Sequence, residues 1–254
     1  MTQRAVDLFD QVAPVFDEVL PFFSGFGTLQ IDWLAPTPGT RMLDLGAGIG
    51  ALTAAALARG CRVTAIDVAP AMVARLSERH PEVQAQVMDA HHLDFPDDSF
   101  DLVCAGFVIH LLDDPAAAAA EVRRVLVPGG TFSFSCPTGT EGDRWDFYGD
   151  LLQEFQAHIP AGGGRLGRPL DGSELLTAAG FTGVTEYDID QFLPVADADT
   201  FWRFALSHGS KAFIDSLPDQ PRAQFEARLR AELATMDPIV YEAGATFYRG
   251  TSGP

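Results

Sequence analysis

Short apolar runs alternate with longer amphipathic stretches between residues 41 and 135. A short apolar run bounded by glycine or proline predicts a buried strand, and apolar positions at helical spacing predict a helix. The expected strands are 42–45, 62–67, 83–88, 100–105 and 131–135, with helices at 51–59, 70–79 and 115–126 and a turn at 128–130. Because these strands are mainly apolar and alternate with helices, the pattern predicts a doubly wound, mainly parallel α/β sheet.

The residues at the helix ends support these boundaries. Gly60 follows the first helix and Pro70 opens the second. Glycine just after a helix and proline in its first turn are typical of helix ends. Asp113 or Asp114 is expected to cap the third helix at Pro115, because a carboxylate there accepts a backbone N–H of the first turn.

The two flanks have a different pattern. Residues 1–35 are rich in aromatic residues at helical spacing, and we expect an N-terminal helical lid segment there. Residues 36–254 are expected to form the main domain, with a small helical lid insertion around 197–220. Beyond residue 136 the pattern predicts helices at 145–158, 173–179, 200–216 and 221–236 and strands at 184–192 and 239–249. The two added strands bring the expected sheet to seven strands.

Composition and charge narrow the class of protein. Hydrophobic residues make up 47% of the 254 residues and charged residues 20%, as in an ordinary globular protein. The net charge is −18 and Lys211 is the only lysine. A field of this sign repels phosphate backbones and anionic membranes, so neither a nucleic acid nor a membrane is an expected partner.

The cysteines indicate a reducing compartment. Cys61, Cys104 and Cys136 lie in apolar runs and form no C-x-x-C pair, so buried free thiols are expected. No bound metal is expected, because His and Cys show no metal-ligand spacing. Residues 1–9 lack a long apolar segment, and we therefore expect a cytoplasmic protein without a signal peptide.

A glycine-rich turn joins the first strand to the first helix. Residues 43–50 read Leu-Asp-Leu-Gly-Ala-Gly-Ile-Gly. Backbone without a Cβ lets a ligand approach closely, and the amides that open a helix favour negative charge. On its own this pattern is also that of a plain tight turn between strand and helix.

Polar and aromatic residues follow the next three strands. Asp67 ends the second strand, Asp89 and Ala90 follow the third, and Phe107 and His110 follow the fourth. The carboxyl ends of parallel strands meet at the edge where open α/β sheets bind ligands. A nucleoside accounts for all of these positions, because Asp67 can accept both ribose hydroxyls and Asp89 the exocyclic amine of adenine.

The stretch 41–135 strongly resembles class I S-adenosylmethionine (SAM)-dependent methyltransferases, in the branch that includes ubiquinone and menaquinone biosynthesis enzymes and many secondary-metabolite enzymes. The residues that carry the resemblance are 43–50, 67–72, 89–101, 107–111 and 124–130. Residues 9–17 are similar to a segment that in this branch often closes over the cofactor, with Phe16 where tyrosine is common. The resemblance implies a Rossmann-like fold and SAM as cofactor, with S-adenosylhomocysteine as product.

The resemblance also implies a role for individual residues in binding SAM. Around the methionine part it places Asp44, which faces the amine, together with Gly46, Ala47, Gly48 and Phe107. Around the nucleoside it places Asp67 at the ribose and Val68, Met72, Asp89, Ala90 and His91 at the adenine.

The acceptor side is less defined by the sequence. A sulfonium methyl is already activated, so positioning supplies much of the rate, and a base is needed only when the acceptor keeps its proton. His110 is the candidate base, the alternative being a histidine that packs against or caps the following helix. The residues expected in the acceptor pocket are Phe16, Phe22, Phe23, Arg144, Trp145, Trp202 and His208. Ordinary lid packing is the alternative for the aromatic residues, and an exposed position for Arg144.

The expected function is methyl transfer to a small-molecule or small peptide-derived acceptor, in bacterial secondary or cofactor metabolism. Two alternatives stay open: an enzyme that holds SAM while its lid pocket catalyses a cyclisation or rearrangement, and a non-catalytic SAM-binding protein. The sequence leaves open whether oxygen, nitrogen or carbon is methylated, and whether the chain is a monomer or a homodimer.

Overall fold

A seven-stranded sheet forms the centre of the computed structural model, which describes residues 1–139 and 144–253. The strand order is β3-β2-β1-β4-β5-β7-β6. The strands are β1 (Arg41–Leu45), β2 (Arg62–Asp67), β3 (Gln84–Val87), β4 (Phe100–Gly106), β5 (Leu126–Gly139), β6 (Phe181–Val195) and β7 (Ile239–Ser252). β7 runs antiparallel to β5 and β6, whereas β1 to β5 pair in parallel. The predicted mainly parallel α/β fold is confirmed.

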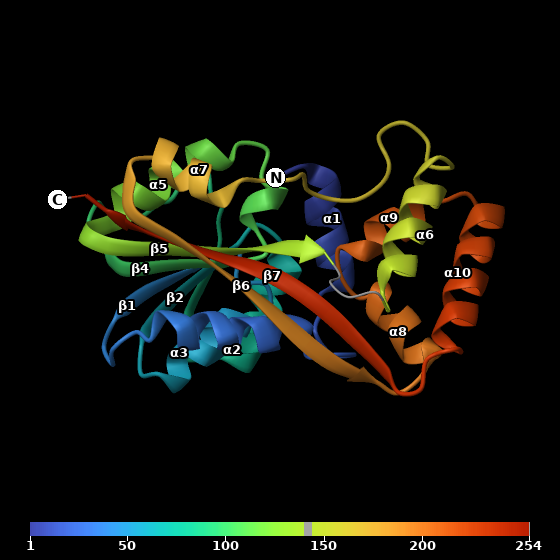
Figure 1. Ribbon diagram of the computed structural model, residues 1–254. Helices are drawn as coiled ribbons and strands as arrows, with labels where there is room; N and C mark the ends of the chain where they lie inside the picture. The colour runs from blue at the N-terminus through green and yellow to red at the C-terminus, as the bar shows by residue number, and fades with distance from the viewer. Residues whose placement is uncertain (140–143, 254) are drawn as a thin grey trace.

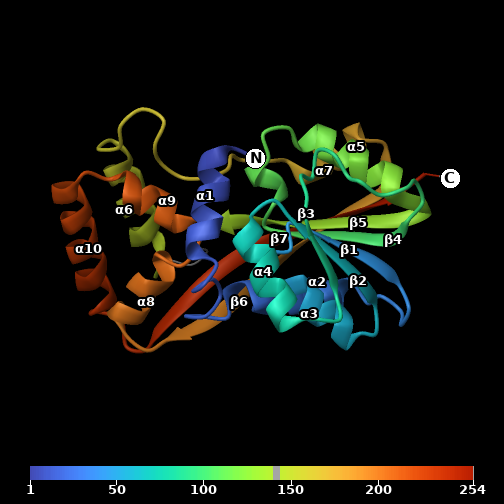
Figure 2. The same ribbon diagram turned by 180° about the vertical axis from the view of Figure 1, so that it is seen from behind.

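Helices cover both faces of this sheet. They are α1 (Gln3–Val12), α2 (Phe22–Leu34), α3 (Ala51–Ala58), α4 (Pro70–Arg79), η1 (Ile109–Leu111), α5 (Pro115–Val125), α6 (Asp146–Gln156), α7 (Gly172–Ala178), α8 (Ala198–Ala205), α9 (Ser210–Ser216) and α10 (Asp219–Leu233). Figures 1 and 2 show α5 and α7 on one face and α2, α3 and α4 on the other. None of the helices in the described ranges is long and apolar enough to cross a membrane.

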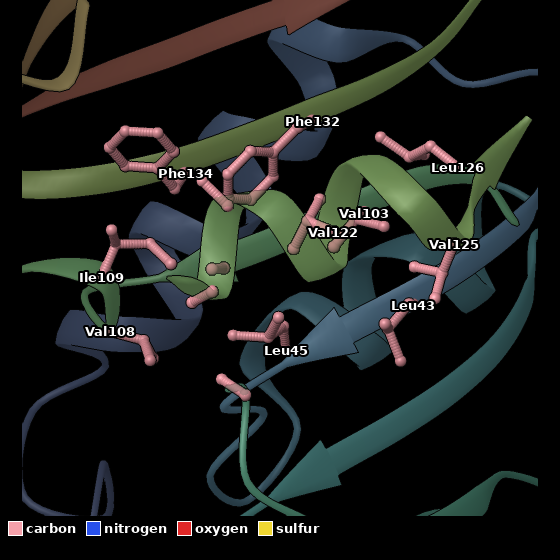
Figure 3. Packing of buried hydrophobic residues seen from close by; sticks show 14 of the residues in the cluster. Leu43, Leu45, Val103, Val108, Ile109, Val122, Val125, Leu126, Phe132 and Phe134 are labelled. Atoms are coloured by element: carbon pink, nitrogen blue, oxygen red, sulfur yellow. The ribbon is translucent and has the colours of Figure 1, made fainter. Parts of the chain in front are cut away.

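The face under α5 shows how the sheet is held. The helix begins at Pro115, where the Asp114 carboxylate accepts the Ala117 N–H at 3.0 Å. Val122 and Val125 of α5 are fully buried and point toward side chains of β1, β4 and β5 (Figure 3). Burying a side chain of this kind stabilises a fold by about 1.5–3 kcal/mol. This packing holds α5 on the sheet.

The structure differs most from the expected elements in two places, while several other boundaries move by two or three residues. β5 begins at Leu126 rather than 131, because Leu126 already pairs with Phe100 before the register shifts to Leu102. The helical region expected at 200–216 is two helices, α8 and α9, which are separated by residues 206–209. The second break places His208 in a connection rather than on a helix.

Four helices form a group of their own beyond one end of the sheet. α6, α8, α9 and α10 share an apolar core that includes Trp145, Phe155, Phe201, Trp202, Phe213 and Phe225. In both Figures 1 and 2, α1 lies between the sheet and this helical group. The segment expected as an insertion, 197–220, contains α8 and α9, and α6 and α10 pack with it.

Candidate active site

A cavity of about 990 Å³ lies where the parallel strands end. Its walls come from the turns after β1, β2 and β4, from the segment that contains α1 and α2, and from the helical group. Ligand pockets have volumes of roughly 300–1,000 Å³, so this cavity has room for a cofactor and a second small molecule.

The glycine-rich turn forms one wall of the cavity. The N–H groups of Gly46 and Ala47 donate to the Ile66 carbonyl at 2.8 and 2.9 Å, which ties the turn to the end of β2. Gly46 has φ of +70°, and a Cβ there would stand 2.4 Å from Val108 Cγ2. Only glycine fits this position. The turn therefore presents bare backbone to the cavity.

Asp67 lies on the wall beside this turn. Its Oδ2 accepts the Gly48 N–H at 2.8 Å and its Oδ1 accepts the Ala69 N–H at 2.9 Å. Burial raises the pKa of the carboxyl group against these hydrogen bonds. A carboxylate oxygen can accept more than one hydrogen bond, so both oxygens can also receive hydroxyl groups from a ligand.

Asp44 is a fully buried carboxylate in the same wall. Its Oδ2 accepts the Thr53 hydroxyl at 2.6 Å, while its buried Oδ1 has no hydrogen-bond partner within the described ranges. Burial raises the pKa of Asp44 to about 7. A buried carboxylate oxygen without a partner is costly, and a cation beside it removes that cost. Asp44 is therefore suited to an ammonium group.

Asp89 and Ala90 line the same cavity, as do Val68 and Met72. Asp89 accepts the His91 N–H at 3.0 Å, and its Oδ1 also lies 2.6 Å from His91 Nδ1. Partial burial opposes ionisation of Asp89, but the hydrogen bonds from His91 hold its pKa below the ordinary value. His91 contacts Asp89 and does not line the cavity. We expected His91 to contact the cofactor, whereas in the structure it positions the Asp89 carboxylate.

Aromatic rings form the opposite side of the cavity. Phe16 stacks on Phe23 with 4.4 Å between ring centroids, and its Cε1 lies 3.7 Å from the point where a Cβ of Gly48 would stand. The ring centroids of Phe22 and Phe107 lie 5.5 Å apart. The N-terminal segment therefore closes over the glycine-rich turn, and the four predicted phenylalanines meet.

Two histidines face the cavity. Burial lowers the pKa of His110 to about 4, and its Nδ1 has no partner in the part of the chain that the structure describes. Burial also lowers the pKa of His208 to about 4, but both of its ring nitrogens are in contact, with the Phe204 carbonyl at 2.7 Å and the Ser210 hydroxyl at 3.1 Å. Both imidazoles are neutral at pH 7.

Three residues expected in the acceptor pocket lie away from the cavity wall. Trp145 is fully buried in the helical group and donates its Nε1–H to the Val240 carbonyl at 2.7 Å. Trp202 packs in the same core, and Arg144 donates to the Pro238 carbonyl at 3.1 Å. Large aromatic side chains supply most of the buried area that such a small helical core needs. This placement corrects the expected pocket role of these three residues.

The cavity also contains residues that sequence reasoning missed. Tyr148, Arg165, Ser210 and Tyr241 line its wall. They lie in segments where the apolar pattern marks a helix, a strand or a loop, with nothing at the sequence level that points to a pocket.

The comparisons with known proteins agree with this geometry. Residues 43–134 match a family model described as a methyltransferase domain. Over 168 residues the chain is 32% identical to aklanonic acid methyltransferase DauC of Streptomyces sp. (strain C5), and it covers 74% of that protein with 62% of its own length. The chain belongs to the class I SAM-dependent methyltransferase family.

Other relatives match the chain over different lengths. Uncharacterized methyltransferase Mb3374 of Mycobacterium bovis is 40% identical over 115 residues, which span 45% of the chain and 47% of Mb3374. The match therefore covers about half the length of that relative. Nocamycin O-methyltransferase of Saccharothrix syringae is 28% identical over 250 residues, 89% of each protein.

Solved structures share the fold of this chain. The YcgJ protein of Bacillus subtilis aligns with a TM-score of 0.60 at 22% identity, over 91% of this chain and 99% of that protein. The [4+2]-cyclase SpnF also aligns with a TM-score of 0.60, at 19% identity over 91% of this chain and 82% of that protein. At these identities the likeness concerns the fold alone.

Proposed function

We propose that this chain transfers the methyl group of SAM to a small acceptor held in the aromatic half of the cavity. The observation that carries the proposal is the unpartnered Oδ1 of Asp44 in the cavity wall. SAM has an ammonium group on its methionine part and a nucleoside at the other end. The buried Asp44 carboxylate fits the ammonium group, and the Asp67 carboxylate can accept hydrogen bonds from the ribose hydroxyls.

The proposed cofactor contacts use residues that the structure brings to one wall. Gly46, Ala47 and Gly48 offer backbone to the methionine part, and Phe107 lies beside it. Val68, Met72, Asp89 and Ala90 surround the place of the adenine. The wall gathers the expected cofactor residues apart from His91, and this agreement supports SAM as the cofactor.

The acceptor is proposed to be small and apolar. The cofactor, when bound, supplies a methyl group on a sulfonium, which is already activated for displacement. The chain's own contribution is to hold the acceptor in line and to exclude water, because positioning supplies much of the rate. The rings of Phe16, Phe22 and Phe23 give such a pocket an apolar wall. With a net charge of −18, the surface does not favour a nucleic acid as acceptor.

Incubation with methyl-labelled SAM and a bacterial metabolite extract tests the proposal. We expect label to pass to at least one small molecule in a protein-dependent manner. If the protein binds S-adenosylhomocysteine and no component of the extract gains label, methyl transfer is contradicted. In that case the rearrangement enzyme and the non-catalytic SAM-binding protein remain.

A further inference from the structure

His208 and Ser210 form a hydrogen-bonded pair on the wall of the cavity. We infer that this pair takes the proton from a neutral hydroxyl group on a planar aromatic acceptor, so that His208, and not His110, is the catalytic base. The inference rests on the proposed function and names the acceptor class of that same site.

The contacts of His208 fix its tautomer. Nδ1 lies 2.7 Å from the Phe204 carbonyl oxygen, which only accepts hydrogen bonds, so Nδ1 carries the hydrogen. Nε2 therefore has the free lone pair, and it lies 3.1 Å from the Ser210 hydroxyl. A base that a third group orients toward a hydroxyl is the arrangement that proton transfer needs.

His110 lacks such an orienting group. Its Nδ1 is buried and has no hydrogen-bond partner in the described ranges. No contact therefore selects one tautomer or aims one nitrogen at the cavity. His110 is available to a ligand as a hydrogen-bonding group, but its geometry is not that of an oriented base.

Aromatic rings pack around His208 and add aromatic surface to this side of the cavity. The centroid of the His208 ring lies 4.4 Å from that of Phe204 and 6.2 Å from that of Phe22. The planes of His208 and Phe22 differ by only 16°. Phe23 lies 6.0 Å from His208 and 5.8 Å from Phe107. Stacked and edge-on ring pairs favour a planar aromatic partner. Phe23 therefore contacts both His208 and Phe107, the residue proposed to lie beside the methionine part of the cofactor.

The charges on the cavity wall favour a neutral acceptor. Among the described residues, six aspartates face the cavity: Asp17, Asp44, Asp67, Asp89, Asp146 and Asp150. Arg165 is the one lysine or arginine that faces it among the described residues. Carboxylates on the wall repel an anionic acceptor. A neutral hydroxyl keeps its proton until the reaction, and it is this proton that requires a base.

The proton and charge balance closes within the cavity. As the acceptor oxygen bonds to the methyl carbon and the carbon–sulfur bond breaks, the hydroxyl proton moves to Ser210 Oγ while the serine proton moves to His208 Nε2. The positive charge lost at sulfur reappears on the imidazole, so the net charge of the cavity does not change. The imidazolium then releases its proton to water.

Binding of two probes tests the hydrogen bond without turnover. Calorimetry compares α-naphthol with its methyl ether, α-methoxynaphthalene, in the presence of S-adenosylhomocysteine. We expect the wild type to bind α-naphthol about tenfold more tightly, as one hydrogen bond implies. Ser210→Ala and His208→Phe should abolish this preference, whereas Ser210→Thr keeps the hydroxyl and should retain it. A wild type that binds neither probe, or that shows no preference, overturns the inference.

Transfer of label from methyl-labelled SAM to α-naphthol tests the base. We expect His208→Phe to lower kcat by about 100-fold or more while the KM for SAM is kept. His158→Phe is the matched control, since His158 is exposed and outside the cavity wall. A loss confined to His110→Phe, unchanged kcat in His208→Phe, no transfer to α-naphthol, or faster transfer to α-naphthoic acid overturns the inference. If the wild type does not bind S-adenosylhomocysteine, the proposed function itself fails.

Discussion

Asp44 combines full burial with an oxygen that has no partner within the described ranges. Burial moves the pKa of this carboxyl from the ordinary 3.8 to about 7. The unfolded chain therefore ionises Asp44 more easily than the folded one. The resulting cost to folding grows as the pH rises from about 4 and is complete above pH 7. Below that range the carboxyl is protonated in both states and the cost is absent.

Asp44→Asn is expected to stabilise the ligand-free protein. At pH 8 the free energy of unfolding should rise on the order of 2–4 kcal/mol, because the asparagine amide is neutral and no charge has to be buried at this site. The gain should shrink as the pH falls from 7 toward 4. Denaturant titrations across this range measure it, and they would contradict the account if the two proteins had equal stability at pH 8. The same variant should bind S-adenosylhomocysteine at least tenfold more weakly.

Asp67→Ala is expected to weaken the binding of S-adenosylhomocysteine by about 100-fold or more, because two hydrogen bonds to a charged acceptor are lost. Calorimetric titration measures this change. Asp32→Ala is the control, since Asp32 is exposed and pairs with Arg59 on the surface. Equal affinity in Asp67→Ala and wild type would show that the ribose assignment is wrong.

The sequence was informative for residues at strand ends. Asp44, Asp67, Asp89 and Phe107 were all expected at one ligand site, and all four line the cavity. Parallel strands bring their carboxyl ends to one edge, so such residues can be placed without a structure. The pocket role of Trp145 could not be judged in this way. An apolar pattern shows that a ring is buried, but not whether it faces a cavity or a helix core.

Arg4 of the N-terminal helix α1 forms hydrogen bonds to α9 and to the loop before α7, in addition to the apolar packing of Leu8 and Val12 with Ala212. The Arg4 guanidinium donates to the carbonyls of Gly162, Gly164 and Ala212 at 3.1, 2.9 and 3.0 Å, and to the Ser216 hydroxyl at 2.9 Å. α1 lies between the sheet and the helical group (Figure 2). These bonds hold α1 across the side of the cavity that the N-terminal segment closes.

Arg4→Ala is expected to loosen α1 and to speed the dissociation of S-adenosylhomocysteine several-fold, because a cover with fewer hydrogen bonds opens more often. Stopped-flow displacement measures the rate. Arg203→Ala, on the exposed face of α8, serves as the comparison. Identical dissociation rates for wild type and Arg4→Ala would mean that α1 does not control release.

Local pattern predicted the elements better than their assembly. β1 to β4 and helices α3 to α5 lie close to the expected positions, since each has a strong apolar period and an end signal such as Pro70 or Asp114. The helical group was foreseen only as the insertion 197–220. Its core brings residues 146–156 together with residues 219–233. Contacts between segments so far apart along the chain cannot be predicted from the local sequence pattern.

At the scale of the whole molecule, the side of the cavity that we assign to the cofactor lies mainly in the family match, whereas the side proposed to hold the acceptor lies mainly outside it. The family model matches residues 43–134, whereas His208, Ser210 and Tyr241, on the side of the cavity where we propose that the acceptor binds, lie outside that range. The cofactor could therefore be predicted from the chain. The acceptor could not, because its pocket is assembled from the N-terminal segment, the helical group and β7.

The most direct test of the central claim is a calorimetric titration of the wild-type protein with S-adenosylhomocysteine. We expect saturable binding at one site, with a negative heat-capacity change because the apolar cavity wall is covered. A parallel titration with NAD should give no binding, since Asp44 suits an ammonium group and not a pyrophosphate. Binding of NAD, or no binding of S-adenosylhomocysteine, would contradict the account.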